Sequence, residues 1–131
     1  MITEDYVSFE TAKLLREKGF AENTPVNYFV GDDKPRGCMV GERIYHKRLE
    51  EDTHLIACPT LQMAMKWLRK THWIDIEVRS YYLNYLKPND TRYYTGKILK
   101  GSEDVIHTIY AKDTYEEVCE AAIKYGLENL I

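Results

Sequence analysis

The spacing of apolar side chains predicts an amphipathic helix near the start of the chain, in "SFETAKLLREKGF". Ser8 is a favoured N-cap residue, because its side chain can accept a hydrogen bond from a free N–H group of the first turn. Gly19 is the expected left-handed terminator, and Leu15 and Phe20 then form the apolar pair that accompanies a Schellman cap. The sequence therefore predicts a helix that begins after Ser8 and ends before Gly19.

A second amphipathic helix is predicted within "PTLQMAMKWLRKTHWIDIEV", with Thr60 as its N-cap. At 100° per residue one side is mainly apolar and the other is polar or basic. The first side holds Leu61, Ala64, Met65, Leu68 and His72, and the second holds Gln62, Lys66, Arg69 and Lys70. We interpret the Met and Trp residues of this stretch as members of a widened stripe that faces the core.

The period then changes from 3.6 to 2, since Ile74, Ile76 and Val78 alternate with charged residues. Such alternation is typical of a strand covered on one side only. Beyond it, the turn signal "KPND" between two β-prone runs predicts a hairpin, and "VIHTIYA" predicts a further strand. A last helix is expected from Asp113, which with Glu116 resembles a capping box.

The segment between the first two helices is less regular. "VNYFV" predicts a strand over 26–30, and "GDDKPRG" predicts a loop over 31–37. A strand or a short helix over 42–51 and a short apolar run over 54–58 follow. The whole pattern predicts an α+β fold, with a mainly antiparallel sheet of about four strands and two or three helices packed on one face.

Composition favours one compact domain over residues 1–131, with 44% hydrophobic residues and no linker or repeat. The acidic start lacks the features of a secretory signal, and no apolar run is long enough to cross a membrane. We therefore expect a cytoplasmic protein with no membrane partner. Three widely spaced cysteines, Cys38, Cys58 and Cys119, fit reduced and mostly buried thiols.

The charge is unevenly distributed along the chain, although the net charge is only −3. Residues 34–100 carry 13 basic and 7 acidic side chains, whereas the segments before and after are acidic. The basic middle indicates either a surface for nucleic acid or neutralisation by the acidic ends. The candidate nucleic-acid-binding residues are Lys66, Arg69, Lys70, Arg43, Lys47 and Arg48.

Tyrosines indicate a third kind of surface. "YYLNYL" places aromatic side chains on both faces of a strand, which is more than one face of a small sheet needs to bury. Tyrosine is enriched in the centres of protein interfaces, so a self-association or adaptor surface is one interpretation. The other is that a helix or the long segment over 38–58 covers the second face. The candidate interface residues are Tyr81, Tyr82, Tyr85, Tyr93 and Tyr94.

The sequence offers no catalytic motif and no cofactor-binding motif that we can name. Its four histidines, His46, His54, His72 and His107, lack the spacing of a metal site. The adjacent carboxylates of "GDDKPRG" are explained by turn formation. Asp75 and Glu77 have a spacing that would suit a metal nuclease, but they are more simply the solvent side of a strand. We therefore predict no catalytic residue, metal or cofactor, and an enzyme is the third hypothesis for function.

Three segments, "SFETAKLLREKGF", "PTLQMAMKWLRKTH" and "TYEEVCEAAIKYGLENLI", resemble small uncharacterised proteins encoded by phages and prophages of Bacteroides-type bacteria. The resemblance implies an accessory protein of a mobile element and brings no catalytic residues. The leading hypothesis is action through a protein contact, with a homodimer as one form. The alternative is a weak nucleic-acid-binding protein that uses the basic face of the helix over 60–72.

Overall fold

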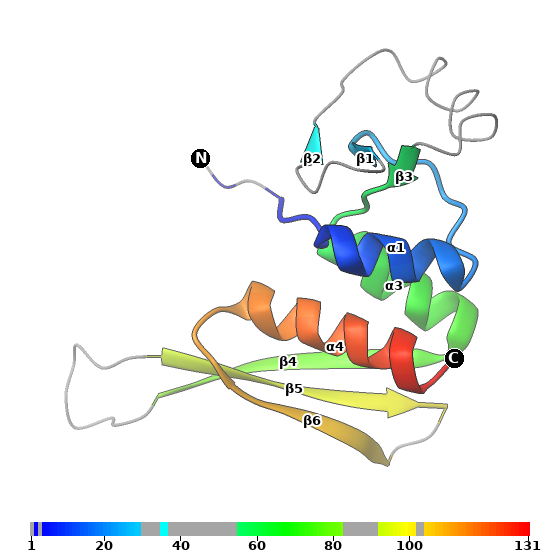
Figure 1. The fold of residues 1–131 in the computed structure, drawn as a ribbon. Helices are drawn as coiled ribbons and strands as arrows, with labels where there is room; N and C mark the ends of the chain where they lie inside the picture. The colour runs from blue at the N-terminus through cyan, green and yellow to red at the C-terminus, as the bar shows by residue number, and fades with distance from the viewer. Residues whose placement is uncertain (1, 3, 30–34, 37–54, 83–91, 102–103) are drawn as a thin grey trace. The chain divides into compact units, whose positions relative to one another are not determined.

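The computed structural model of the chain describes residues 2, 4–29, 35–36, 55–82, 92–101 and 104–131 (Figure 1). The chain packs as two compact units, Met1–Ala64 and Met65–Ile131. Each unit has its own sheet and its own buried side chains. The expectation of one domain over the whole chain stays a prediction.

The first helix, α1 (Phe9–Glu17), has the predicted caps at both ends. The Ser8 hydroxyl accepts a hydrogen bond of 3.2 Å from the backbone N–H three residues further on. At the other end the backbone N–H of Phe20 donates to the carbonyl of Leu15 at 2.9 Å, and Gly19 has φ of +100°. This is the Schellman arrangement, and both predicted ends of the helix are confirmed.

The sheet of the first unit places β1 (Asn27–Phe29) between β2 (Pro35–Arg36) and β3 (Leu55–Ala57), with both pairs antiparallel. The strand predicted over 26–30 is therefore confirmed. The loop predicted over 31–37 is wrong at Pro35 and Arg36, which pair with β1. A proline is tolerated there because β2 is an edge strand, which needs hydrogen bonds on one side only.

The second helix, α3 (Leu61–His72), is confirmed together with its cap, since the Thr60 hydroxyl accepts a hydrogen bond from the backbone N–H of Met63 at 3.1 Å. The apolar side is buried or half-buried, and the basic side is exposed. The interpretation of both tryptophans as members of the core stripe is wrong for Trp73. That residue follows the helix in the left-handed conformation, with φ of +59°, and its side chain is 72% exposed. Trp67 is half-buried, as expected.

The second unit contains an antiparallel sheet of β4 (Ile74–Tyr82), β5 (Arg92–Lys100) and β6 (Val105–Lys112), in that order. The β4–β5 hairpin pairs without interruption from Ile74 opposite Lys100 to Tyr82 opposite Arg92. The predicted hairpin and the strand after it are confirmed. Their turn "KPND" and the segment over 42–51 lie outside the described residues.

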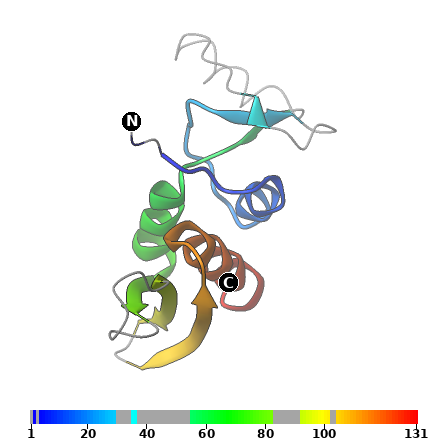
Figure 2. The ribbon, with the colours of Figure 1, turned by 90° about the vertical axis from the view of Figure 1, so that its left-hand side faces the viewer.

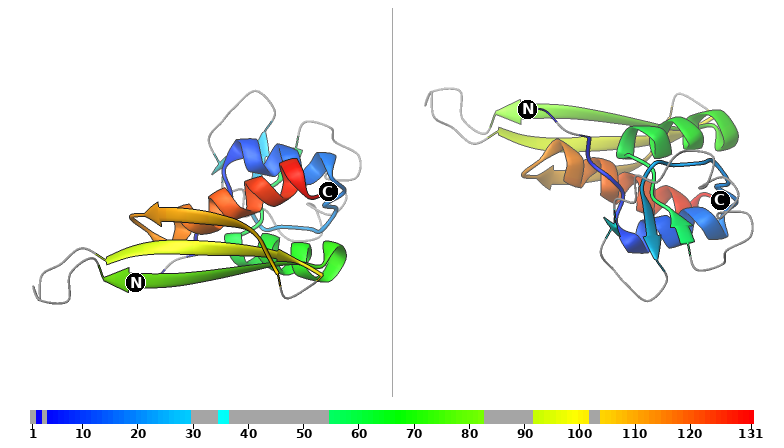
Figure 3. Two further views of the ribbon diagram at one scale, coloured as in Figure 1. Left: turned by 90° about the horizontal axis from the view of Figure 1, so that it is seen from below. Right: turned by 90° about the horizontal axis from the view of Figure 1, so that it is seen from above.

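The last helix, α4 (Tyr115–Asn129), covers one face of this sheet, as Figures 1 and 3 show. It begins one residue later than predicted, because the Thr114 hydroxyl, and not Asp113, caps it by accepting a hydrogen bond from the N–H of Glu117 at 3.1 Å. At its end Lys100 donates a hydrogen bond to the backbone carbonyl of Leu130. A cation at that position is favourable, since it lies at the negative end of the helix dipole.

The predicted α+β class with antiparallel strands is confirmed. The arrangement differs from one sheet of about four strands, because the described strands form two sheets of three. Within the described part of the chain, no helix is long and apolar enough to cross a membrane.

Candidate interaction surfaces

The sheet of the second unit has one face that α4 covers and one face on which no described helix of this unit lies (Figures 1 and 2). Ile98 is fully buried, and Gly96 lies directly under Val118 of α4, so even-numbered side chains of β5 point towards the helix. Side chains alternate along a strand, and the pairing then assigns the other residues to the opposite face. We call this the open face; it comprises Asp75, Glu77, Arg79, Tyr81, Tyr93, Thr95, Lys97, Leu99, Val105 and Thr108.

The predicted tyrosine surface is divided between the two faces. Tyr81 and Tyr93 stack on the open face, with ring centroids 5.5 Å apart, and the guanidinium of Arg79 lies 5.1 Å from the centroid of Tyr81. Tyr94 lies on the helix face, where its ring meets that of Tyr115 of α4 edge to face. Two of the five candidates therefore share a site on the open face.

The remaining predicted tyrosines lie elsewhere. Tyr82 alternates with Tyr81 and so points to the opposite face, where Arg92 donates a hydrogen bond of 3.0 Å to its hydroxyl. Hydrogen bonds with Tyr94 and Tyr82 raise the pKa of the exposed Arg92 guanidinium above its ordinary value. Tyr85 lies outside the described residues. The structure therefore brings together only part of the predicted interface.

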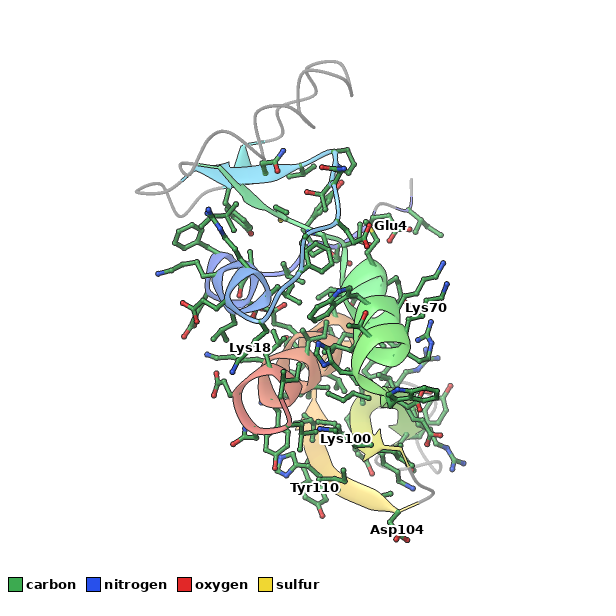
Figure 4. All side chains as sticks on the ribbon, turned by 90° about the vertical axis from the view of Figure 1, so that its right-hand side faces the viewer. Glu4, Lys18, Lys70, Lys100, Asp104 and Tyr110 are labelled. Carbon is green, nitrogen blue, oxygen red and sulfur yellow. The ribbon has the colours of Figure 1, made fainter. Side chains whose placement is uncertain are left out.

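Strand β6 is an edge of the sheet, and it exposes large apolar side chains. Val105 is 45% exposed, Ile106 43% and Tyr110 77%. Figure 4 shows Tyr110 extending from β6 away from α4. Ile106 has no partner in the pairing with β5, because the register shifts there. Between Val105 and Ala111 the strand has no charged side chain.

One side chain of β6 packs against α4. His107 stacks on Tyr125 of α4, with ring centroids 3.8 Å apart and planes 4° from parallel. This histidine is thus a packing residue of the helix face. His72 meets Trp67 edge to face instead, with ring centroids 4.8 Å apart.

The basic side of α3 forms the second candidate surface. Lys66, Arg69 and Lys70 are exposed, and none of them makes an ion pair with a residue that the structure describes. Figure 4 shows Lys70 extending from α3 away from α4. Within the described part of the chain, these three cations are therefore not neutralised by the acidic side chains of α4. The other basic candidates, Arg43, Lys47 and Arg48, lie outside the described residues.

The candidates for metal or acid–base chemistry do not converge in the described part of the chain. Asp75 and Glu77 lie on the open face, opposite Leu99 and Lys97. Among the residues that are placed, no three or more His, Cys, Asp or Glu side chains are grouped as metal ligands would be. His46, His54 and the carboxylates of "GDDKPRG" lie outside that part of the chain.

The described cysteines are buried free thiols, as predicted. Cys58 is a buried residue of the first unit, and Cys119 is a buried residue of α4. Burial raises the pKa of the Cys119 thiol to about 11. Because the thiolate is the reactive form, Cys119 is a structural thiol at neutral pH. Cys38 lies outside the described residues.

No protein-family model matches this chain, and neither the curated proteins nor the solved structures that were compared with it gave a match. The resemblance to phage and prophage proteins therefore stays a prediction. The site residues that sequence reasoning missed are Trp73 and the exposed side chains of β6. The lack of charge in "VIHTIYA" was a signal for the second of these.

Proposed function

We propose that this protein is an accessory protein of the phage or prophage type that acts through a protein contact, and that a second copy of the chain is one partner. The resemblance of its three helical segments supports that cellular context. The observation that carries the proposal is the edge strand β6, with its exposed apolar side chains and its lack of charge.

An edge strand presents unpaired backbone N–H and C=O groups, to which another strand can bind. Proteins usually block such pairing with charged residues, especially lysine, or with proline on the edge. The opposite edge, β4, carries Asp75, Glu77 and Arg79, whereas β6 carries no charge between Val105 and Ala111. In an antiparallel pair of two β6 strands no like charges would face each other in that segment. The contrast between the two edges supports β6 as the contact strand.

Sedimentation velocity across micromolar concentrations tests this proposal. We expect the wild-type chain to form dimers, and Ile106→Lys to be monomeric, because a lysine at an exposed edge position opposes pairing. Ser80→Lys is the matched control, since it adds the same charge at an exposed position of the other edge strand and should leave the dimer intact. A wild-type chain that is monomeric at every concentration would remove the proposal.

A second candidate function is nucleic-acid binding by the basic side of α3. The specific observation in its favour is that Lys66, Arg69 and Lys70 are exposed and make no ion pair with the described residues. Unpaired lysine and arginine side chains can neutralise phosphates and release their counterions. Titration of labelled DNA and RNA at low salt tests this function, and an absence of salt-sensitive binding would exclude it.

A further inference from the structure

Trp73 combines two features that rarely occur together. Its φ of +59° is in the left-handed region, which glycine and asparagine usually occupy and which is strained for a bulky residue. Its side chain is 72% exposed, so the fold gains little from burying the indole. Strained residues with no structural benefit are concentrated at functional sites.

The backbone around Trp73 is held in place by the second unit. The N–H of Gly101 donates a hydrogen bond of 3.0 Å to the Trp73 carbonyl, and Ile74, the next residue, is fully buried. The junction between α3 and β4 is therefore rigid, although the indole itself is in solvent. An aromatic group held in this way is prepared to bind a ligand without a further loss of backbone freedom.

The three cations of α3 lie between the middle and the end of the helix, close in sequence to this junction. Lys66 and Lys70 are four residues apart and so lie on the same side of the helix, with Arg69 beside Lys70. Trp73 follows immediately after the helix. We call Lys66, Arg69, Lys70 and Trp73 the α3 stripe.

We propose that the α3 stripe binds single-stranded nucleic acid, with phosphates along Lys66, Arg69 and Lys70 and one base stacked on Trp73. This inference rests on the second candidate function above and specifies its ligand. Proteins that bind single strands without sequence preference combine a positively charged track with exposed aromatic side chains in this way.

The chemistry of the stripe favours this ligand over the two other classes of macromolecule. A duplex keeps its bases stacked on one another and offers no free base face to an indole, whereas a single strand does. A protein partner is less suitable, because interface centres are depleted in lysine and the stripe contains two lysines. The acidic residues of the chain do not prevent local binding, since none of them pairs with these cations in the described part of the structure.

The proposal has quantitative consequences. Neutralising three phosphates on a single strand gives a slope of log K against log salt of about −2, so each doubling of salt weakens binding about fourfold. Loss of one stacked base weakens binding about 5- to 150-fold. Removing one cation changes the slope by about 0.7.

Fluorescence anisotropy of the full chain with labelled 12-nucleotide oligo-dT and oligo-U, and with a DNA duplex of equal length, tests these values. We expect both single strands to bind more tightly than the duplex, Trp73→Gly to lose affinity without a change of salt slope, and Lys66→Gln to lower the slope. The control is Lys124→Gln, which removes an equal charge from α4, where Lys124 lies 3.9 Å from Glu128. It should leave both the affinity and the slope unchanged.

The outcomes separate the inference from the function on which it rests. If duplex and single strand bind equally and Trp73→Gly has no effect, the basic side of α3 binds nucleic acid but the stacking proposal is wrong. If no oligonucleotide shows salt-sensitive binding, both the stacking proposal and the nucleic-acid function are wrong. Circular dichroism of each variant checks that a loss of binding is not a loss of fold.

Discussion

Among the glycines that the structure describes, Gly96 has the least room for a side chain. It lies in the middle of β5, and a Cβ atom built there would lie 2.5 Å from Cγ1 of Val118 on α4. Carbon atoms in contact are about 3.5–4.0 Å apart, so Val118 or the helix would have to move by about 1 Å. Val118 is fully buried and β-branched, and in a helix such a side chain has one strongly preferred rotamer.

We therefore expect Gly96→Ala to lower the free energy of unfolding by about 1–3 kcal/mol, the usual cost of an overfilled core. Without the contact, alanine would be better than glycine in a strand by about 0.5–1 kcal/mol. Urea denaturation followed by circular dichroism measures the change. Val118→Ala alone should cost about 2 kcal/mol, because it removes two buried carbon atoms and leaves space behind.

The double variant Gly96→Ala with Val118→Ala makes the test specific. The new methyl group would occupy the space that the valine leaves, so the double variant should be more stable than the sum of the two single changes by at least about 1 kcal/mol. Strict additivity would refute the reasoning. Gly126→Ala is the matched control, because its Cβ atom would lie at an ordinary 3.8 Å from Ile74. This change in a helix interior should stabilise the protein by about 0.5–1 kcal/mol.

Three other predictions follow from single side chains. Trp73→Asn should raise the free energy of unfolding, measured in urea, by about 0.5–1.5 kcal/mol, because asparagine accepts the left-handed conformation that strains tryptophan and little burial of the indole is lost. His107→Ala should cost about 0.5–1.5 kcal/mol in the same assay through loss of the stack on Tyr125, and His107→Phe should restore part of it. Cys119 should react with iodoacetamide at pH 8 about a hundredfold more slowly than an ordinary thiol, because its pKa is about 11 against 9.0. The unfolded chain loses this proton first, so stability should fall as the pH rises from about 9 towards 11.

The helix ends show how far local sequence can be interpreted. The caps at Ser8, Gly19 and Thr60 depend on hydrogen bonds between residues three to five positions apart, and all were predicted. The start of α4 was misplaced by one residue because "DTYEE" offers two identical patterns. Asp113 and Thr114 are both capping residues, and each has a glutamate three positions later. Only the tertiary position of the helix decides between them.

The candidate sites were less predictable than the helices. The basic side of α3 follows from the helical period alone, so Lys66, Arg69 and Lys70 were correctly placed on one exposed surface. The tyrosines were grouped by composition, but alternation along the strands divides Tyr81 and Tyr93 from Tyr82 and Tyr94. Composition carries no information about which face of a sheet a helix covers.

The sequence by itself determined the secondary structure of the described helices and of the long hairpin, because periodicity and caps act over a few residues. Only the tertiary structure decided that the described strands form two sheets, that β6 lies at an edge, and that Trp73 points into solvent. These features depend on which distant segments pair and on a turn between helix and strand that leaves no room for a loop. A hydrophobic pattern shows that a side chain prefers burial, and the fold decides whether anything is there to bury it.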